Sequence, residues 1–83
     1  MARDADVVLY GTSWCEVCAQ ARAHLDARGV AYFSRDIETD PDAFDAYRAQ
    51  GGNGAVPLLV VGGETLTGFN PEMLDARLAQ LGD

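Results

Sequence analysis

The sequence predicts an α/β protein whose elements follow the order β-α-β-α-β-β-α, with a mixed four-stranded sheet flanked by three helices. Two apolar runs, Asp6 to Tyr10 and Leu58 to Val61, are typical of strands covered on both faces. The helical stretch after the first run links it to a second strand, and such strand–helix–strand units are parallel crossovers. Gly62-Gly63 is a hairpin signal, so the fourth strand should be antiparallel to the third.

Composition bounds the size of the protein and its partners. The chain has 83 residues, so we expect one domain spanning 1–83. Its formal net charge is −7, with 13 Asp and Glu against 6 basic residues, all of them Arg. This balance argues against nucleic-acid or anionic-membrane partners, which need clustered Lys and Arg, and permits a partner with a basic docking face. We expect a monomer.

The termini and apolar runs indicate the compartment. We expect a frayed start over residues 1–5, and we find no secretory signal or run of transmembrane length. The expected location is therefore cytoplasmic. In a reducing cytosol, two cysteines are catalytic or metal-binding more often than they form a structural disulfide.

The first half of the chain contains one well-marked helix. It should run from Cys15 or Glu16 to Arg28 and end at Gly29, a residue favoured just beyond a helix. Its sheet-facing residues should be Val17, Cys18, Ala21 and Leu25. The stretch Val30 to Ile37, with its aromatic residues, predicts the second strand.

A second helix follows. Thr39 or Asp40 should cap it, because Pro41 suits the first helical position, where a missing N–H costs nothing. It should end at or just before Gly51. Its modest apolar face consists of Ala43, Phe44 and Tyr47.

The last third predicts a hairpin and a closing helix. Residues 51–54 form a Gly-rich turn before the third strand, and Glu64 to Thr67 is a short fourth strand. Asn70 should cap the last helix, with Pro71 at its first position. The apolar positions of that helix are Leu74, Leu78 and Leu81.

The two cysteines, Cys15 and Cys18, carry the candidate chemistry. They follow a strand and a short turn and open a helix, the setting that separates a redox Cys-x-x-Cys from an accidental pair. Free N–H groups at an exposed helix start stabilise a thiolate, which is the reactive form. The second cysteine, one turn on, should be less exposed and close enough to form a disulfide. The alternative is two buried structural thiols.

A metal centre within one chain is not expected. A mononuclear zinc site needs about four ligands. His24 is the sole histidine; it should point to a different side of the helix from Cys18 and face solvent.

Three motifs together resemble the glutaredoxin family of the thioredoxin superfamily, over roughly residues 6–82. They are Cys15-Glu16-Val17-Cys18 after the first strand, Val56-Pro57 before the third and Gly68 before the last helix. The resemblance implies a thioredoxin-like fold and a thiol-disulfide oxidoreductase. Cys15 would attack a protein or glutathione mixed disulfide, Cys18 would resolve it, Pro57 would be cis, and the Val56 backbone would pair with the substrate. The implied substrate- or glutathione-binding residues are Trp14, Val56, Pro57, Gly68, Phe69 and Asn70.

Some positions depart from the usual glutaredoxin pattern. Thr12 stands where a basic residue is common, Ala55 where Thr is usual, and Glu16-Val17 where Pro-Tyr is typical. The stretch 68–72 is similar to glutaredoxin-like hydrogen donors of ribonucleotide reductase, which take electrons from thioredoxin reductase. Glutathione, as a co-substrate, and thioredoxin reductase therefore both stay open as the electron source.

Other readings stay open too. Trp14 either fills space beside the loop or contacts the substrate, and Phe69 has the character of a core residue. Gly68 would serve close backbone approach. The rival function is a carrier or adaptor that holds an iron–sulfur cluster at a dimer interface through the same cysteine.

Overall fold

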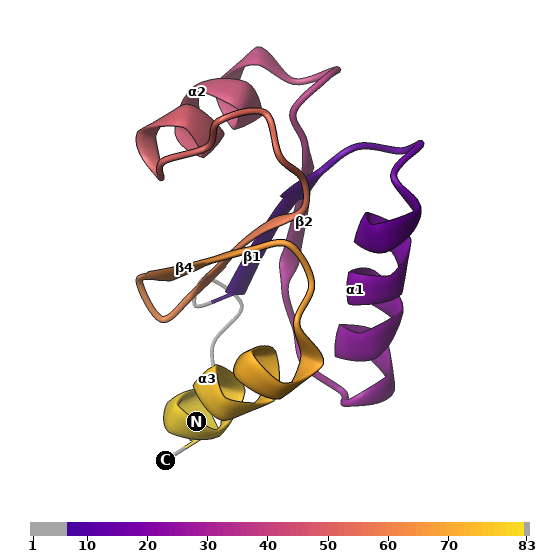
Figure 1. Ribbon diagram of the computed structural model, residues 1–83, viewed down its shortest axis with the longest axis vertical. Coiled ribbons are helices and arrows are strands. Elements are labelled where there is room, and N and C mark those ends of the chain that lie inside the picture. Colours follow the sequence, from indigo (N-terminus) through magenta and orange to yellow (C-terminus); the bar gives the residue numbers. More distant parts are fainter. Residues whose placement is uncertain (1–6, 83) are drawn as a thin grey trace.

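The computed structural model describes residues 7–82 (Figure 1). The predicted frayed start over 1–5 and the strand start at Asp6 lie outside these residues. In chain order the elements are β1 (Val7–Gly11), α1 (Glu16–Ala27), β2 (Phe33–Asp36), α2 (Pro41–Ala49), β3 (Leu58–Val61), β4 (Glu64–Thr67) and α3 (Pro71–Gly82). The predicted order of seven elements is confirmed.

The four strands form one mixed sheet in the order β2-β1-β3-β4. β1 runs parallel to β2 and antiparallel to β3, and β3 pairs antiparallel with β4. The connection between β3 and β4 is Gly62-Gly63, whose φ angles of 59° and 86° suit a tight two-residue hairpin. The α/β fold class is therefore as predicted.

Alternate residues of β1 and β3 supply two cores, one on each face of the sheet. One core joins the sheet to α1 and α3 through Val7, Leu9, Ala21, Leu25, Leu59, Val61 and Leu74. The other joins the sheet to α2 through Tyr10, Tyr47, Leu58 and Val60. Figure 1 shows α1 beside the sheet, with α2 and α3 near opposite ends of it. Since side chains alternate along a strand, continuous apolar runs are what a sheet covered on both faces requires.

The second strand is shorter than predicted. The expectation of Val30 to Ile37 is wrong, because β2 covers only Phe33–Asp36. The N–H of Val30 donates to the carbonyl of Leu25 at 3.0 Å, the bond that closes a Schellman motif beyond α1. Val30 and Tyr32 instead pack, half-buried, against the first core.

Two side chains on the helices lie elsewhere than expected. Val17 is 42% exposed, so it does not pack on the sheet as predicted; the buried face of α1 is Cys18, Ala21 and Leu25. Phe44 on α2 is 41% exposed, whereas Ala43 and Tyr47 are buried. Val17 precedes the buried Cys18, and Phe44 follows the buried Ala43. Adjacent side chains on a helix point about 100° apart, so each of the two falls outside the buried face.

His24 does not face solvent as predicted. It is half-buried between α1 and α3: its Nε2 lies 2.8 Å from Oδ1 of Asp75, and its ring meets Phe69 edge-on at 5.4 Å. Arg28 contacts the same carboxylate through Nε at 3.1 Å. Asp75 thus ties the helix that begins at the cysteines to the last helix of the chain.

The helix caps follow the predicted chemistry. Asp40 caps α2, accepting hydrogen bonds from the N–H groups of Asp42 and Ala43, with Pro41 at the first position. The Asn70 side chain accepts from the N–H of Met73, as predicted for the start of α3. Among residues 7–82, no helix combines the length and apolar character needed to span a bilayer.

Candidate functional site

Strand register brings four loops to one end of the sheet. Gly11, the last residue of β1, pairs with Asp36, the last residue of β2. Tyr10 pairs with Leu58 at the start of β3, and Leu58 in turn pairs with Thr67 at the end of β4. Three segments must therefore meet at this end of the sheet: the one with the two cysteines, the one with Val56-Pro57, and the one with Gly68. The farthest apart in sequence, Cys15 and Gly68, are separated by 53 positions.

Cys15 and Cys18 sit at the first turn of α1. Cys15 is the N-cap residue, and its Sγ accepts a hydrogen bond from the N–H of Cys18 at 3.2 Å. A donor of this kind, at the positive end of a helix, interacts favourably with a negative charge on sulfur. Both cysteines are free thiols in this structure.

The order of exposure of the two cysteines is as predicted, with one correction. Cys18 is 0% exposed and Cys15 is 8% exposed. Cys15 is therefore mostly covered, rather than openly exposed as expected. The reason is tertiary: the residue sits at the sheet end where several loops converge.

The Cys18 thiol is held in its neutral form. Burial, followed by a hydrogen bond to the sulfur of Cys15, raises the pKa of Cys18 from 9.0 to about 11, while a hydrogen bond with the backbone of Thr12 acts in the opposite direction. At neutral pH Cys18 is thus a protonated thiol. Such a group can lose its proton late in a reaction rather than start one.

Gly11 lets Cys18 approach the end of β1. A Cβ placed on Gly11 would lie 2.7 Å from the sulfur of Cys18 and 3.2 Å from Leu9. Contacts under 3.0 Å force neighbouring atoms to move, and these neighbours are core atoms. A glycine as the last residue of β1 is therefore a requirement of the site.

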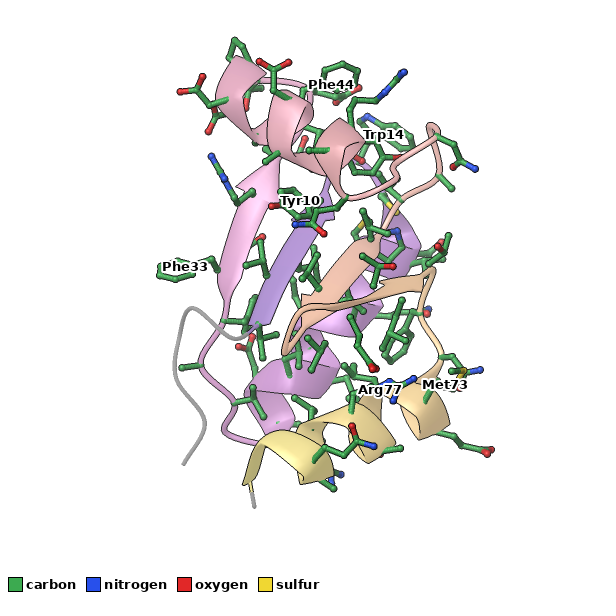
Figure 2. All side chains as sticks on the ribbon, turned by 90° about the vertical axis from the view of Figure 1, so that its left-hand side faces the viewer. Tyr10, Trp14, Phe33, Phe44, Met73 and Arg77 are labelled. Atoms are coloured by element: carbon green, nitrogen blue, oxygen red, sulfur yellow. The ribbon has the colours of Figure 1, made fainter. Side chains whose placement is uncertain are left out.

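Trp14 is the most exposed aromatic residue beside the cysteines, at 68%. The reading in which it fills space is wrong. Its indole N–H donates to Oε1 of Glu38 at 2.7 Å. Figure 2 shows Trp14 toward the end of the molecule where α2 lies. The contact with Glu38, in the loop after β2, was not expected because no local pattern links residues 24 positions apart.

The predicted binding segments flank the cysteines. The Val56–Pro57 peptide is cis, as predicted, and the carbonyl of Pro57 accepts from the N–H of Gly68 at 2.8 Å. Gly68 has φ of 77°, and a Cβ there would meet no atom within 4 Å. Its left-handed backbone favours glycine, and its expected role in close backbone approach stays a prediction. Phe69 packs half-buried against the first core, next to His24.

The contacts of Tyr47 go beyond the apolar helix face that the sequence predicts for it. Its hydroxyl bonds to the backbone of residues 54 and 55, just before Val56. The local signal was the Gly-rich stretch 51–54, which leaves room for a large ring beside it.

A cavity of about 220 Å³ lies beside the loop that precedes Cys15. It is lined by Gly11, Thr12, Ser13, Arg22 and residues 34–36 of β2. Its volume is below the roughly 300 Å³ at which pockets begin to enclose a drug-sized ligand. A large substrate would therefore bind at the protein surface rather than inside this cavity. Within residues 7–82, no group of three His, Cys, Asp or Glu side chains is arranged to hold a metal ion.

Comparisons with known proteins agree with this geometry. The glutaredoxin family model matches residues 7–66. A Mycobacterium tuberculosis protein provisionally named a glutaredoxin is 33% identical over 79 residues, covering 93% of this chain and 94% of the relative. The glutaredoxin-like protein NrdH of Salmonella typhimurium is 28% identical over 69 residues, covering 83% and 84%.

A solved structure gives the same answer. The glutaredoxin-like NrdH-redoxin from Escherichia coli superposes with a TM-score of 0.74 at 26% identity, over 84% of this chain and 91% of that one. That NrdH-redoxin is described as having a thioredoxin-like activity profile. With the family model matched over most of the chain and the fold shared, this protein belongs to the glutaredoxin family, within the thioredoxin superfamily.

Proposed function

We propose that this protein is a dithiol oxidoreductase that reduces protein disulfides or glutathione mixed disulfides, with Cys15 as the nucleophile and Cys18 as the resolving thiol. One observation carries the assignment of roles. The backbone N–H of Cys18 donates to the sulfur of Cys15 at the start of α1, while Cys18 itself is fully buried with a raised pKa. The two sulfurs are thus unequal in the way that a two-step exchange requires.

The reaction balances as two successive exchanges. The Cys15 thiolate attacks one sulfur of the substrate disulfide, the S–S bond breaks, and the departing thiolate takes a proton from water. Cys18 then gives up its proton and attacks the Cys15 sulfur, which releases the second substrate thiol. The substrate gains two electrons and two protons in all, and the protein is left with a Cys15–Cys18 disulfide.

The backbone of Val56 is the proposed docking edge for the substrate. Among residues 7–82, the N–H and C=O of Val56 make no backbone hydrogen bond, so both can pair with an extended chain. Register places Val56 at the sheet end where Cys15 lies. The half-buried Phe69 and the exposed Trp14 lie in the loops that flank it.

The electron source is either glutathione or a thioredoxin reductase. Two glutathione molecules, or the dithiol of a reductase, can each return two electrons to the Cys15–Cys18 disulfide. The absence of a basic side chain at position 12 weakens the case for holding a glutathione carboxylate. The likeness to NrdH proteins favours the reductase. We propose a cytoplasmic setting, where such reductants operate.

The test is turnover of a protein disulfide by the purified protein in two coupled assays. One assay uses glutathione with glutathione reductase, and the other uses thioredoxin reductase; both follow the loss of NADPH absorbance. Cys15→Ser should abolish turnover in both. Cys18→Ser should keep glutathione-dependent exchange, which needs one thiol, and lose activity with the reductase.

Disulfide reduction that survives Cys15→Ser would refute the roles assigned to the two sulfurs. A brown preparation whose visible absorption disappears in Cys15→Ser would instead support the rival function, a cluster held between two chains.

A further inference from the structure

Tyr47 is a fully buried tyrosine whose hydroxyl is bonded on two sides to one loop. The hydroxyl donates to the carbonyl of Ala55 at 2.6 Å and accepts from the N–H of Gly54 at 2.8 Å. The backbone carbonyl of Tyr47 also accepts from the N–H of Gly52 at 2.9 Å. One residue of α2 therefore holds the loop 52–55 at three backbone positions.

The loop is shaped to accept the ring. A Cβ on Gly52 would overlap the ring of Tyr47, so a glycine is needed where the ring lies. On its other sides the ring is packed against Phe44 and Tyr10, with centroids 6.2 Å away in each case. Figure 2 shows Tyr10 below α2, on the side of the sheet that α2 covers. The tyrosine is thus fixed by the core, and the loop is fixed by the tyrosine.

The clamped loop leads directly into the proposed docking edge. Ala55, whose carbonyl receives the Tyr47 hydroxyl, precedes Val56, whose backbone groups are left free. Beyond Val56, the carbonyl of Pro57 is held by Gly68. Val56 is therefore fixed from both sides: by α2 through Ala55, and by the end of β4 through Pro57.

We propose that Tyr47 is a positioning residue that determines substrate specificity: its hydroxyl holds Val56 in place to pair with the backbone of a peptide-like disulfide beside Cys15. This proposal rests on the proposed disulfide exchange and concerns which class of disulfide the Cys15 site prefers. Substrates that offer a peptide backbone to Val56 depend on the clamp, whereas small disulfides without a peptide backbone do not.

The test is Tyr47→Phe, which keeps the ring in the core and removes only the hydroxyl. Reduction of a peptide disulfide should show a KM about five- to tenfold higher with kcat within about twofold, because a lost hydrogen bond loosens docking rather than chemistry. Reaction of the reduced protein with dithiobis(nitrobenzoate), and alkylation of Cys15 by iodoacetamide, should change less than about twofold. Amide exchange at Gly54 should become faster.

Tyr10→Phe is the matched control, since it removes a hydroxyl from the same core cluster and should leave the peptide KM unchanged. Gly52→Ala, which pushes the ring from the loop side, should raise that KM as Tyr47→Phe does. An unchanged peptide KM in Tyr47→Phe overturns the inference alone. Parallel slowing with the small reagents also overturns it, since the tyrosine would then shape the cysteines themselves. If the wild-type protein reduces neither the peptide disulfide nor dithiobis(nitrobenzoate), the proposed function is refuted as well.

Discussion

Burial of the Cys18 thiol makes stability of the reduced protein depend on pH in the alkaline range. In the unfolded chain this thiol ionises near its ordinary pKa of 9.0, whereas in the folded protein the pKa of Cys18 is about 11. Between these values the folded state keeps a proton that the unfolded state has lost. Stability is therefore full below pH 9 and falls as the pH rises toward 11.

The size of the effect follows from the pKa difference. Two pKa units correspond to about 2–3 kcal/mol, at roughly 1.4 kcal/mol per unit. For a domain whose free energy of unfolding is of the order of 5–15 kcal/mol, this is a large share. Half of the loss should have occurred near pH 10.

The assay is urea unfolding of the reduced protein, from pH 8 to 11, for the wild type and Cys18→Ala. The variant lacks the titrating thiol, so its stability should fall less steeply with pH. Burial and Asp26 also raise the pKa of Tyr32, so Tyr32 lowers the stability at high pH in both proteins. Its contribution cancels when the two free energies of unfolding are subtracted. The difference between the two free energies should change by about 2–3 kcal/mol across the range.

Parallel curves for the two proteins would refute this reasoning. They would mean that Cys18 ionises equally easily in the folded and unfolded states. Cys18 could then no longer be assigned the second step of the exchange on the ground that it is a buried neutral thiol.

Two further predictions concern stability. Gly11→Ala should lower the free energy of unfolding by about 1–3 kcal/mol in urea titrations and slow formation of the intramolecular disulfide, because the new Cβ displaces Cys18; unchanged values for both would show that this end of β1 has spare room. Asp75→Ala removes the carboxylate on α3 that contacts His24 and Arg28 on α1, and its effect is read from urea unfolding. These groups are partly exposed, so the loss should be under about 1 kcal/mol and should shrink in 1 M salt.

Local patterns were sufficient for the elements and their chemistry. Apolar runs predicted strands covered on both faces, and Gly62-Gly63 predicted the hairpin. Short-range hydrogen-bonding preferences narrowed the cap of α2 to Thr39 or Asp40, and they predicted Asn70 as the cap of α3. The spacing of two cysteines at a helix start predicted one sulfur deeper than the other. Each of these depends on residues within a few positions of one another.

Contacts between distant segments were decided only by the tertiary structure. His24 looked solvent-facing until α3 brought Asp75 beside it, 51 positions away. Trp14 gained a hydrogen bond to Glu38 from the loop after β2, and Gly68 adopted a left-handed backbone.

The sequence by itself determined which elements form, in what order, and that a Cys-x-x-Cys opens the first helix, because propensity, periodicity and capping are local. Only the folded chain decided that Cys15 is largely covered, that Val56 lies at the same end of the sheet as Cys15, and that Tyr47 holds the loop 52–55 that leads to Val56. These depend on strand register and on how a buried ring fits against a glycine, and both are set by the packing of the whole molecule.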